Sequence, residues 1–290
     1  MGRMSAPSFR LLPALLTGLA LLGGSAAAFE IRVLPEAPLP GDILRVSVTG
    51  SNAPSRFSAT LDGTAYRLHP DGARGLRALI GLTAQDPPGW RSLLIVRRRA
   101  LLPDQRRTAG FLVGKRTFAH QRLRMRRSKA KLLEDPEARD ALLKIRAVLA
   151  LESDLQLWEG TFVRPAAGRK TSSYGLRRTI NKDVPWDWHK GLDFAAAEGS
   201  PILAPNSGRV LLAGRFPLQG GTVLIDHGQG LVSALLHLKS FSVRAGDTVR
   251  KGQRIAEAGG GGLSTGSHLH WGVYVHGAPV DPEPLLGRAP

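Results

Sequence analysis

Cysteine is absent from the 290 residues of this chain. Its absence excludes disulfide bonds, thiolate metal ligands and a lipidated N-terminal cysteine. Any metal site must therefore use histidine, aspartate or glutamate, and the fold must be stabilised by its core. A hydrophobic fraction of 42% and a charged fraction of 22% are typical of a soluble globular protein. The length is enough for about two domains.

Long hydrophobic runs are also lacking, with one exception at the N-terminus. Two arginines precede an apolar run from Leu11 to Leu22, and small residues follow up to Ala28. This pattern predicts a signal peptide over residues 1–28, cleaved after Ala28, and a periplasmic, secreted or envelope-associated protein. The alternative is an uncleaved anchor, but about 12 apolar residues interrupted by Pro13 fall short of the ~20 that span a bilayer. No transmembrane span is predicted in the mature form.

Acidic residues are nearly missing from residues 97–131, which hold thirteen lysines and arginines against one acid, Asp104. Much of the formal net charge of +17 lies in this stretch. Such a density is typical of proteins that bind nucleic acid or an anionic surface. Export argues against nucleic acid, so we predict anionic envelope polymers or membrane headgroups as partners of the segment Arg97–Lys131. The alternative is a solvated basic face without a dedicated ligand.

Residues 29–100 contain short apolar or alternating runs separated by turn signals, among them Asp62–Gly63 between two strand-like runs. About six strands with this spacing predict an immunoglobulin-like β-sandwich. No chemistry is visible here, so the segment is expected to be a spacer or binding module. The predicted runs are Ile31–Val33, Ile43–Val48, Phe57–Leu61, Ala65–Leu68, Ala78–Leu82 and Leu93–Val96.

Residues 101–160 combine the basic segment with a predicted linker helix. Asp135 is the expected N-cap, and Pro136 occupies the first helical position. Apolar residues at three- and four-residue spacing then continue to about Leu155. This helix is expected to link or brace the two halves.

Helical periodicity of useful length is absent from residues 161–290, where glycine-containing turns separate strand-like runs. The sequence therefore predicts an antiparallel all-β domain. The expected strands are Val210–Ala213, Thr222–Asp226, Leu231–Leu238, Arg254–Ala258 and Leu269–Val275.

Two pairs of potential metal ligands lie in this half. His268 and His270 are two residues apart in a predicted strand, so their imidazoles share a face, as His189 and Asp193 do if that segment is extended. A hydrolytic zinc site needs three protein ligands and an open fourth position. His189, Asp193 and one of the paired histidines meet that need, and the spacing does not say which one. The remaining histidine and His237 are candidates for the general base and the donor to the substrate oxygen.

The order of these motifs resembles that of the lysostaphin-like (LytM-type) zinc metallopeptidases. His189–Asp193 is similar to their H-x-G-x-D motif, and Ser264–His270 to their S-T-G-x-H-L-H motif. The resemblance covers about residues 162–286 and implies one zinc ion held by His189, Asp193 and His270, with His237 and His268 as the catalytic pair. Other matching segments are Ser173–Arg177, Gly199–Pro205, Gly208–Val210, His237–Leu238 and Gly246–Gln253.

Members of that family cut peptides of bacterial peptidoglycan, so the resemblance implies an exported endopeptidase with this substrate. We also predict Arg177, Tyr174 and Ser264 as substrate-binding residues. The alternative is a non-catalytic cell-wall-binding protein or a regulator that activates a partner amidase, a kind of member that typically loses metal ligands. A further hypothesis is that the N-terminal half restrains the peptidase. Departures from the family pattern that bear on substrate preference are Leu235, Ser267 and the run Gly259–Gly262.

Overall fold

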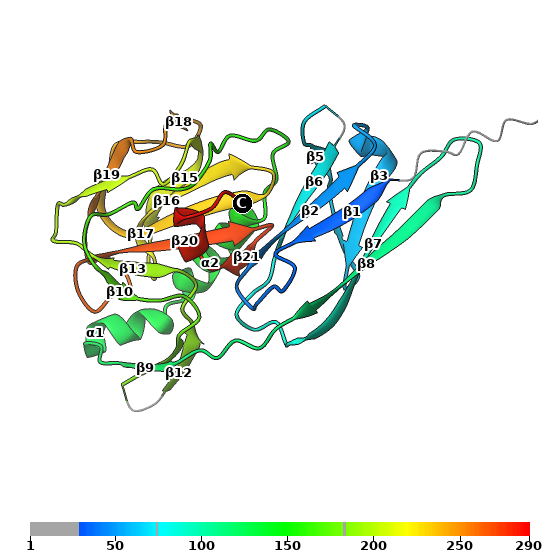
Figure 1. Cartoon of the computed structure of the whole chain (residues 1–290). Coiled ribbons are helices and arrows are strands. Elements are labelled where there is room, and N and C mark those ends of the chain that lie inside the picture. Colours follow the sequence, from blue (N-terminus) through cyan, green and yellow to red (C-terminus); the bar gives the residue numbers. More distant parts are fainter. Residues whose placement is uncertain (1–28, 74, 182–183) are drawn as a thin grey trace, which may run out of the picture.

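The computed structural model describes residues 29–73, 75–181 and 184–290, and these residues form mostly β-strands. The predicted mostly-β fold class is confirmed. An N-terminal module, blue and cyan in Figure 1, lies beside a C-terminal sheet drawn in yellow to red. The predicted signal peptide lies outside the described residues. None of the helices in the described ranges is long and apolar enough to cross a membrane.

The N-terminal module consists of two four-stranded antiparallel sheets that share one buried core. Asp62 (φ 49°) and Gly63 (φ 81°) connect β3 to β4 with the two positive φ angles of a type I′ turn, so the predicted hairpin is confirmed. The immunoglobulin-like type of the module stays a prediction. In spatial order the first sheet contains β1 (Glu30–Leu34), β2 (Ile43–Thr49), β6 (Gly75–Gly81) and β5 (His69–Pro70). The second contains β4 (Thr64–Tyr66), β3 (Phe57–Leu61), β7 (Gly89–Arg97) and β8 (Gln105–Val113).

Strand β8 extends this module beyond its predicted boundary at residue 100. It pairs with β7 in unbroken register from Arg97↔Gln105 to Gly89↔Val113. Only Phe111 and Val113 of β8 are buried, because β8 lies at the edge of its sheet and most of its side chains face solvent. That sparse apolar signal explains why the sequence predicted a basic segment here and not a hairpin.

The linker helix is present as α2 (Pro136–Leu149) and begins as predicted, with the Asp135 side chain accepting a hydrogen bond from the Glu137 amide. It ends about one and a half turns before the predicted Leu155. The chain beyond it is held in an extended course by backbone hydrogen bonds, including Leu157 N–H to the His227 carbonyl (2.8 Å). Because these tertiary contacts hold the chain extended, the helix ends at Leu149 although the helical spacing of apolar residues continues beyond it. A second helix, α1 (Arg127–Ala130), precedes it.

The C-terminal half is built on a ten-stranded antiparallel sheet, and its predicted strands are all present. Along the sheet the order is β10 (Lys170–Ser172), β13 (Leu192–Ala195), β20 (His268–Val275), β17 (Leu231–Phe241), β16 (Gly220–Gly228), β15 (Gly208–Phe216) and β18 (Thr248–Val249). Three further strands pair beside this path: β14 (Pro201–Leu203), β19 (Arg254–Ala258) and β21 (Ala278–Val280). A separate small sheet contains β12 (Val184–Trp188), β11 (Arg177–Ile180) and β9 (His120–Leu123).

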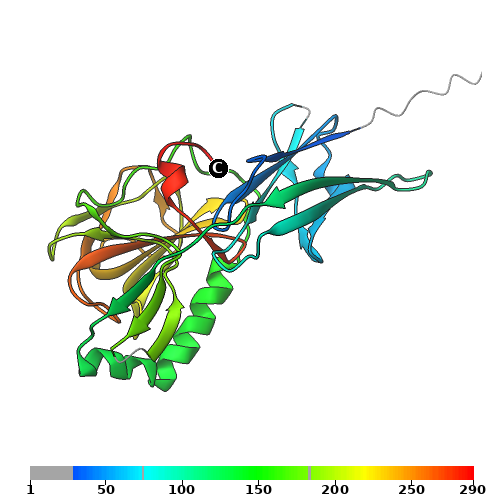
Figure 2. The ribbon, with the colours of Figure 1, turned by 60° about the horizontal axis from the view of Figure 1, so that its bottom comes forward.

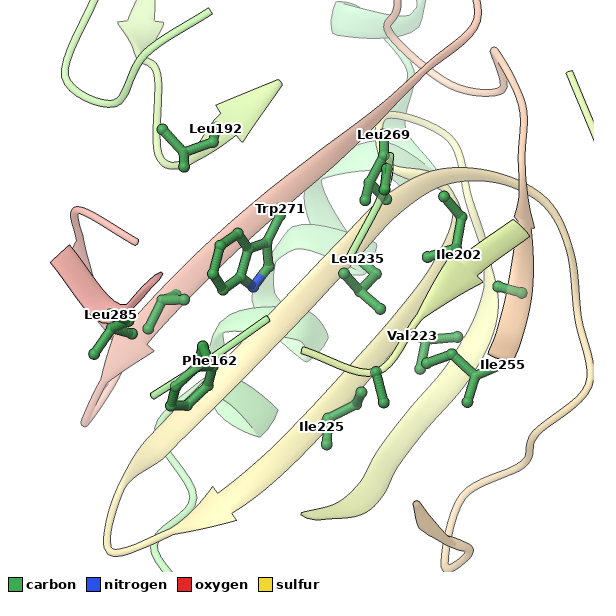
Figure 3. Close-up of a cluster of buried hydrophobic side chains, with 14 of the residues drawn as sticks. Phe162, Leu192, Ile202, Val223, Ile225, Leu235, Ile255, Leu269, Trp271 and Leu285 are labelled. Carbon is green, nitrogen blue, oxygen red and sulfur yellow. The ribbon is translucent and has the colours of Figure 1, made fainter. Parts of the chain in front are cut away.

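The two faces of the large sheet differ in what covers them. On one face Trp271, Leu235 and Leu269 belong to the main core, where Figure 3 shows them among other buried apolar side chains. On the other face α2 packs through Ile145 and Leu149 against a smaller cluster. Figure 2 shows α2, in green, running beside the sheet. Side chains alternate along each strand, so β20 presents Trp271 to the main core and His270 to the face of α2.

Buried polar contacts fix the N-terminal module to the C-terminal sheet. Arg77 of β6 is 3% exposed, and its guanidinium donates to Gln229 Oε1 (2.7 Å) and Gln156 Oε1 (2.7 Å). Arg116 forms an ion pair with Asp281 at 2.6 Å. Because a buried guanidinium is costly unless its donors are satisfied, these partners make the relative placement of the two halves specific.

Candidate metal centre

Strand register places two of the predicted ligands side by side. Asp193 of β13 lies directly opposite His270 of β20, so their side chains share one face of the sheet. His189 precedes β13 in a close turn that passes over β20 at Gly191. A Cβ on Gly191 would lie 2.3 Å from the Trp271 carbonyl oxygen. Only glycine allows this approach, which explains the glycine between the two ligands.

The ligand atoms of His189, Asp193 and His270 converge on one point. His189 Nε2 lies 2.9 Å from Asp193 Oδ1 and 3.0 Å from His270 Nδ1, and His270 Nδ1 lies 2.9 Å from the same carboxylate oxygen. All three residues are buried, and they form a group able to hold a metal ion. Two imidazole nitrogens and a carboxylate oxygen are a donor set typical of catalytic zinc.

Outer contacts orient these ligands. His189 Nδ1 donates to the Ser173 carbonyl (2.7 Å), so its Nε2 carries the lone pair that faces the other two. Asp193 Oδ2 accepts from Arg178 Nη2 (2.8 Å), so its Oδ1 is left for the centre. Gln121 of β9 in turn accepts from Arg178 Nε (2.8 Å). Such supporting hydrogen bonds are usual around metal ligands.

The protonation states fit metal binding as well. Burial lowers the pKa of His270 to about 4, which keeps its nitrogen deprotonated at neutral pH. Burial acts to raise the pKa of Asp193, but charge interactions and hydrogen bonds with His189 and His270 outweigh it and hold that pKa well below its usual range. A metal ligand needs a neutral imidazole and an ionised carboxylate.

His237 reaches the same site through an irregularity in β17. Regular alternation from Leu235 and Leu236 would turn His237 into the main core. Instead, one extra residue in β17 opposite Gly221–Val223 forms a bulge, and His237 takes a φ of 64°. Bulges and positive φ at non-glycine residues re-aim side chains next to functional sites. The His237 ring centroid consequently lies 4.8 Å from that of His268 and 6.2 Å from that of His270.

Both of these outer histidines have their Nδ1 occupied. His237 Nδ1 donates to the Gly261 carbonyl (2.9 Å), and His268 Nδ1 donates to the Gly266 carbonyl (2.9 Å). Their Nε2 atoms are therefore the basic ones. His268 Nε2 lies 3.8 Å from Asp193 Oδ1. Burial lowers the pKa of His237 to about 3, so its imidazole is neutral at physiological pH.

These side chains open onto a cleft of about 370 Å³, lined among others by Asp193, His270, His237, His268 and Ser264. A larger groove of about 960 Å³ adjoins it and continues along α2. Ser264, predicted to bind substrate, lines the cleft, and its hydroxyl donates to the Gly260 carbonyl (2.7 Å).

The other two predicted substrate residues are placed differently. Tyr174 is 3% exposed, and its hydroxyl donates to the Pro279 carbonyl (2.8 Å) and accepts from the Ala84 amide (2.8 Å). It joins the two halves of the molecule, and a substrate-binding role does not fit this position. Arg177 is exposed, whereas its neighbour Arg178 lines the cleft. The two arginines differ in this way because adjacent side chains on β11 point to opposite faces.

A segment from the basic region crosses this site and was not foreseen. Leu123 and Met125 line both the cleft and the adjoining groove. Lys129 of α1 then donates to the carbonyls of Gly260 (2.9 Å) and Gly262 (2.6 Å) in the glycine run at the rim. We call residues 120–130 the strap. It lies over the entrance to the centre, and no local sequence pattern indicates such a long-range contact.

The family model of peptidase family M23 matches residues 187–282, which include all three converging ligands and both outer histidines. Residues 187–282 match this family, and the predicted resemblance to lysostaphin-like peptidases is confirmed. The segment Ser173–Arg177 lies outside the matched range.

Curated relatives match over the same part of the chain. One is an uncharacterized metalloprotease of Haemophilus influenzae, 41% identical over 95 residues, or 32% of this chain and 20% of that protein. Another is the peptidoglycan DD-endopeptidase ShyB of Vibrio cholerae, 39% identical over 93 residues, or 32% of this chain and 22% of that protein. The chain thus spans about a fifth of the length of these relatives.

A solved structure extends the likeness to the whole architecture. A Pseudomonas aeruginosa protein described as a candidate peptidase M23 is 28% identical, with a TM-score of 0.64, and the match covers 86% of this chain and 95% of that one. Because the match covers 86% of this chain, it includes parts of both the N-terminal module and the C-terminal sheet. The combination of the two is therefore shared with another protein.

Proposed function

We propose that this chain is an exported zinc metalloendopeptidase that hydrolyses peptide bonds in bacterial peptidoglycan. One observation carries the proposal: a buried group of two histidines and an aspartate faces two further histidines across an open cleft. A structural zinc site would be closed by a fourth protein ligand. Here the neighbouring histidines are held by carbonyl groups at their Nδ1 atoms and offer their Nε2 atoms to the cleft.

His189, Asp193 and His270 are the proposed zinc ligands. Their donors lie close together, the outer atoms of His189 and Asp193 are hydrogen-bonded, and the lowered pKa values of Asp193 and His270 suit a divalent cation. Bound zinc would supply the Lewis acidity that makes water a nucleophile at neutral pH and polarises the scissile carbonyl. Arg178 keeps Oδ2 of Asp193 engaged, so the carboxylate presents a single oxygen to the ion.

His237 and His268 are the proposed catalytic pair. The Nε2 lone pair of either side chain can take a proton from the attacking water, and the protonated ring can then donate a hydrogen bond to the oxyanion or the leaving amine. The carbonyls of Gly261 and Gly266 fix the tautomer and ring orientation that this requires. The resemblance assigns both residues to catalysis and does not divide the two tasks between them.

Peptidoglycan is the proposed substrate because the Vibrio cholerae relative is named a peptidoglycan DD-endopeptidase. The predicted signal peptide fits a substrate outside the cytoplasm. The cleft is lined by small and hydroxyl-bearing residues such as Ser264, Thr265 and Gly266, which leave room for a peptide backbone. Export, zinc and substrate form one consistent proposal.

Digestion of purified sacculi by the predicted mature chain, residues 29–290, tests this function. Mass spectrometry of the released fragments should show cleaved peptide bonds with intact glycan, and a zinc chelator should abolish the release. Arg244→Ala is the control, because the Arg244 side chain is 91% exposed and lies outside both the cleft and the strap. A zinc-loaded protein that binds sacculi but releases nothing would instead favour the amidase-activating or wall-binding alternative.

A further inference from the structure

The β7–β8 hairpin carries an unusual apex. Its paired strands end at Arg97↔Gln105, and residues 98–104 connect them. Figure 1 and Figure 2 both show the hairpin projecting away from the rest of the molecule. At its apex Leu101 is 96% exposed and Leu102 is 58% exposed. Single exposed leucines are common, but two adjacent ones at a projecting apex indicate a contact surface.

Arginines surround these two leucines. The hairpin apex and the strand ends beside it carry five arginines against one acid, Asp104. Two of the five lie over aromatic rings of the module: Arg97 over Phe57 (5.8 Å) and Arg107 over Phe29 (5.6 Å). The other three are Arg98 and Arg99 in the connection and Arg106 of β8.

The rest of the basic segment does not belong to this surface. Arg116 is used in the ion pair with Asp281, and Lys129 binds the carbonyls of the glycine run. The thirteen basic residues from Arg97 to Lys131 therefore do not form one continuous face. Their net charge does not by itself support an anionic polymer as the partner, and the apex has to be considered separately.

We propose that the hairpin apex, residues 97–107, docks on the surface of an anionic phospholipid bilayer. Leu101 and Leu102 enter the interfacial region, while the surrounding guanidinium groups bind lipid phosphates. A soluble polyanion would account for the arginines but would leave the leucines in water. A protein partner would be expected to bind a surface of complementary shape. A convex apex with long cationic side chains is better suited to a fluid bilayer surface.

This docking leaves the candidate metal centre accessible. In Figure 1 the hairpin apex lies at the opposite end of the molecule from α1 and from β9, whose Gln121 and Leu123 line the cleft. A molecule standing on a membrane by its hairpin would therefore hold the cleft away from the lipid. The inference goes beyond the proposed peptidase activity and does not depend on it.

Vesicle co-sedimentation of residues 29–290 tests the proposal. Binding is expected to vesicles that contain phosphatidylglycerol and to be much weaker with phosphatidylcholine alone. Each arginine near an anionic surface contributes roughly fivefold to binding, so Arg98→Gln/Arg99→Gln/Arg106→Gln should weaken it by about 100-fold. Leu101→Ser/Leu102→Ser should weaken it by about tenfold or more, because two leucines no longer leave water.

The matched control removes the same charge elsewhere. Arg139, Arg244 and Arg250 lie on exposed surfaces outside the hairpin, and their change to glutamine should leave vesicle binding nearly unchanged. Equal losses in both triple variants would overturn the proposal. So would undiminished binding of the leucine variant, or binding to soluble polyphosphate that competes fully with vesicles, since each result would show a contact made by charge alone.

Discussion

Arg178 is the residue outside the proposed ligand set on which the geometry of the centre depends most directly. It holds one oxygen of Asp193 at 2.8 Å and is itself held by Gln121. Without it, the carboxylate is free to rotate and to present either oxygen, which raises the entropic cost of binding a metal. Residues that support metal ligands typically contribute 10- to 100-fold to affinity.

Arg178→Gln is therefore expected to weaken zinc binding by about 10- to 100-fold, measured by competition with a chromogenic chelator. Arg178→Lys should recover only part of this loss, because a point charge does not replace the guanidinium fork. Arg177→Gln, one residue away and exposed, is the matched control. Equal zinc affinities in Arg178→Gln and Arg177→Gln would show that Arg178 does not support zinc binding.

His227 governs part of the acid stability, away from the metal centre. It is fully buried, its Nδ1 donates to the Ser207 carbonyl (2.8 Å), and its Nε2 accepts from the Ser233 hydroxyl (2.8 Å). Burial lowers its pKa from 6.5 to about 4. A histidine with a lowered pKa in the folded state stabilises that state fully above the unfolded pKa, and this contribution is lost as pH falls towards the folded pKa.

The free energy of unfolding should accordingly fall between pH 6.5 and pH 4, with His227 contributing a loss of about 3 kcal/mol. His227→Asn should be less stable at neutral pH but should lose less stability on acidification. Urea unfolding of both proteins, without zinc, near neutral pH and near pH 4 measures this. The same loss in the variant as in the wild type would contradict the assignment.

Among the elements, the strap is placed where it could restrict access to the centre. Leu123 and Met125 lie over the cleft, and Lys129 fastens this segment to the glycine run through two charge-assisted hydrogen bonds. These contacts of the strap with the rim give a physical basis to the hypothesis that upstream residues restrain the peptidase. The restraint would act locally, through residues 120–130, and need not involve the whole N-terminal module.

Lys129→Ala is expected to raise kcat/KM on sacculi about threefold or more, mainly through a lower KM, because two hydrogen bonds to a charged group no longer hold the strap closed. Lys131→Ala removes the same charge from an exposed neighbouring position and serves as the control. An unchanged or lowered kcat/KM in Lys129→Ala would show that the strap does not limit access.

The residues of the centre could largely be predicted from the sequence, whereas the strand pairing that places them could not. Spacing and alternation indicated His189, Asp193 and one of His268 and His270. The resemblance selected His270, and the register of β13 with β20 places Asp193 directly opposite it. His237 was a candidate that the resemblance assigned to the catalytic pair, but the bulge that turns it towards the centre depends on an extra residue in β17 relative to β16. A pairing between strands distant in the sequence cannot be predicted from local alternation.

Other differences have the same origin. Tyr174 matched a motif, yet its hydroxyl is used between the two halves, a contact made only in the folded molecule. The end of α2 at Leu149 and the burial of Arg77 also follow from tertiary hydrogen bonds. Local propensity and periodicity predict which elements form, whereas the contacts between elements decide which side chains reach the site.

At the scale of the whole molecule, the two halves are expected to unfold together. Leu79 of the N-terminal module lies in the main core of the C-terminal half, and the buried Arg77 is bound to Gln229 and Gln156. Removal of this guanidinium would leave both amide oxygens without their donor. The cost of such buried unsatisfied groups is about 1–3 kcal/mol each.

Arg77→Ala should therefore lower the free energy of unfolding by about 2–4 kcal/mol and separate one calorimetric transition into two. Arg67→Ala is the matched control: Arg67 also joins the halves, through Asp154 (2.8 Å), but its side chain is 61% exposed. An exposed ion pair contributes about 1 kcal/mol or less. Similar calorimetric profiles for both variants would show that the buried contact does not couple the halves.

The central claim is that His189, Asp193 and His270 bind zinc while His237 acts on the substrate. Zinc content and release of peptidoglycan fragments, measured together on His270→Ala and His237→Ala, test it most directly. We predict that His270→Ala loses both, whereas His237→Ala retains zinc and loses activity by about 100-fold or more. Full fragment release by His270→Ala, or loss of zinc from His237→Ala, would contradict the account.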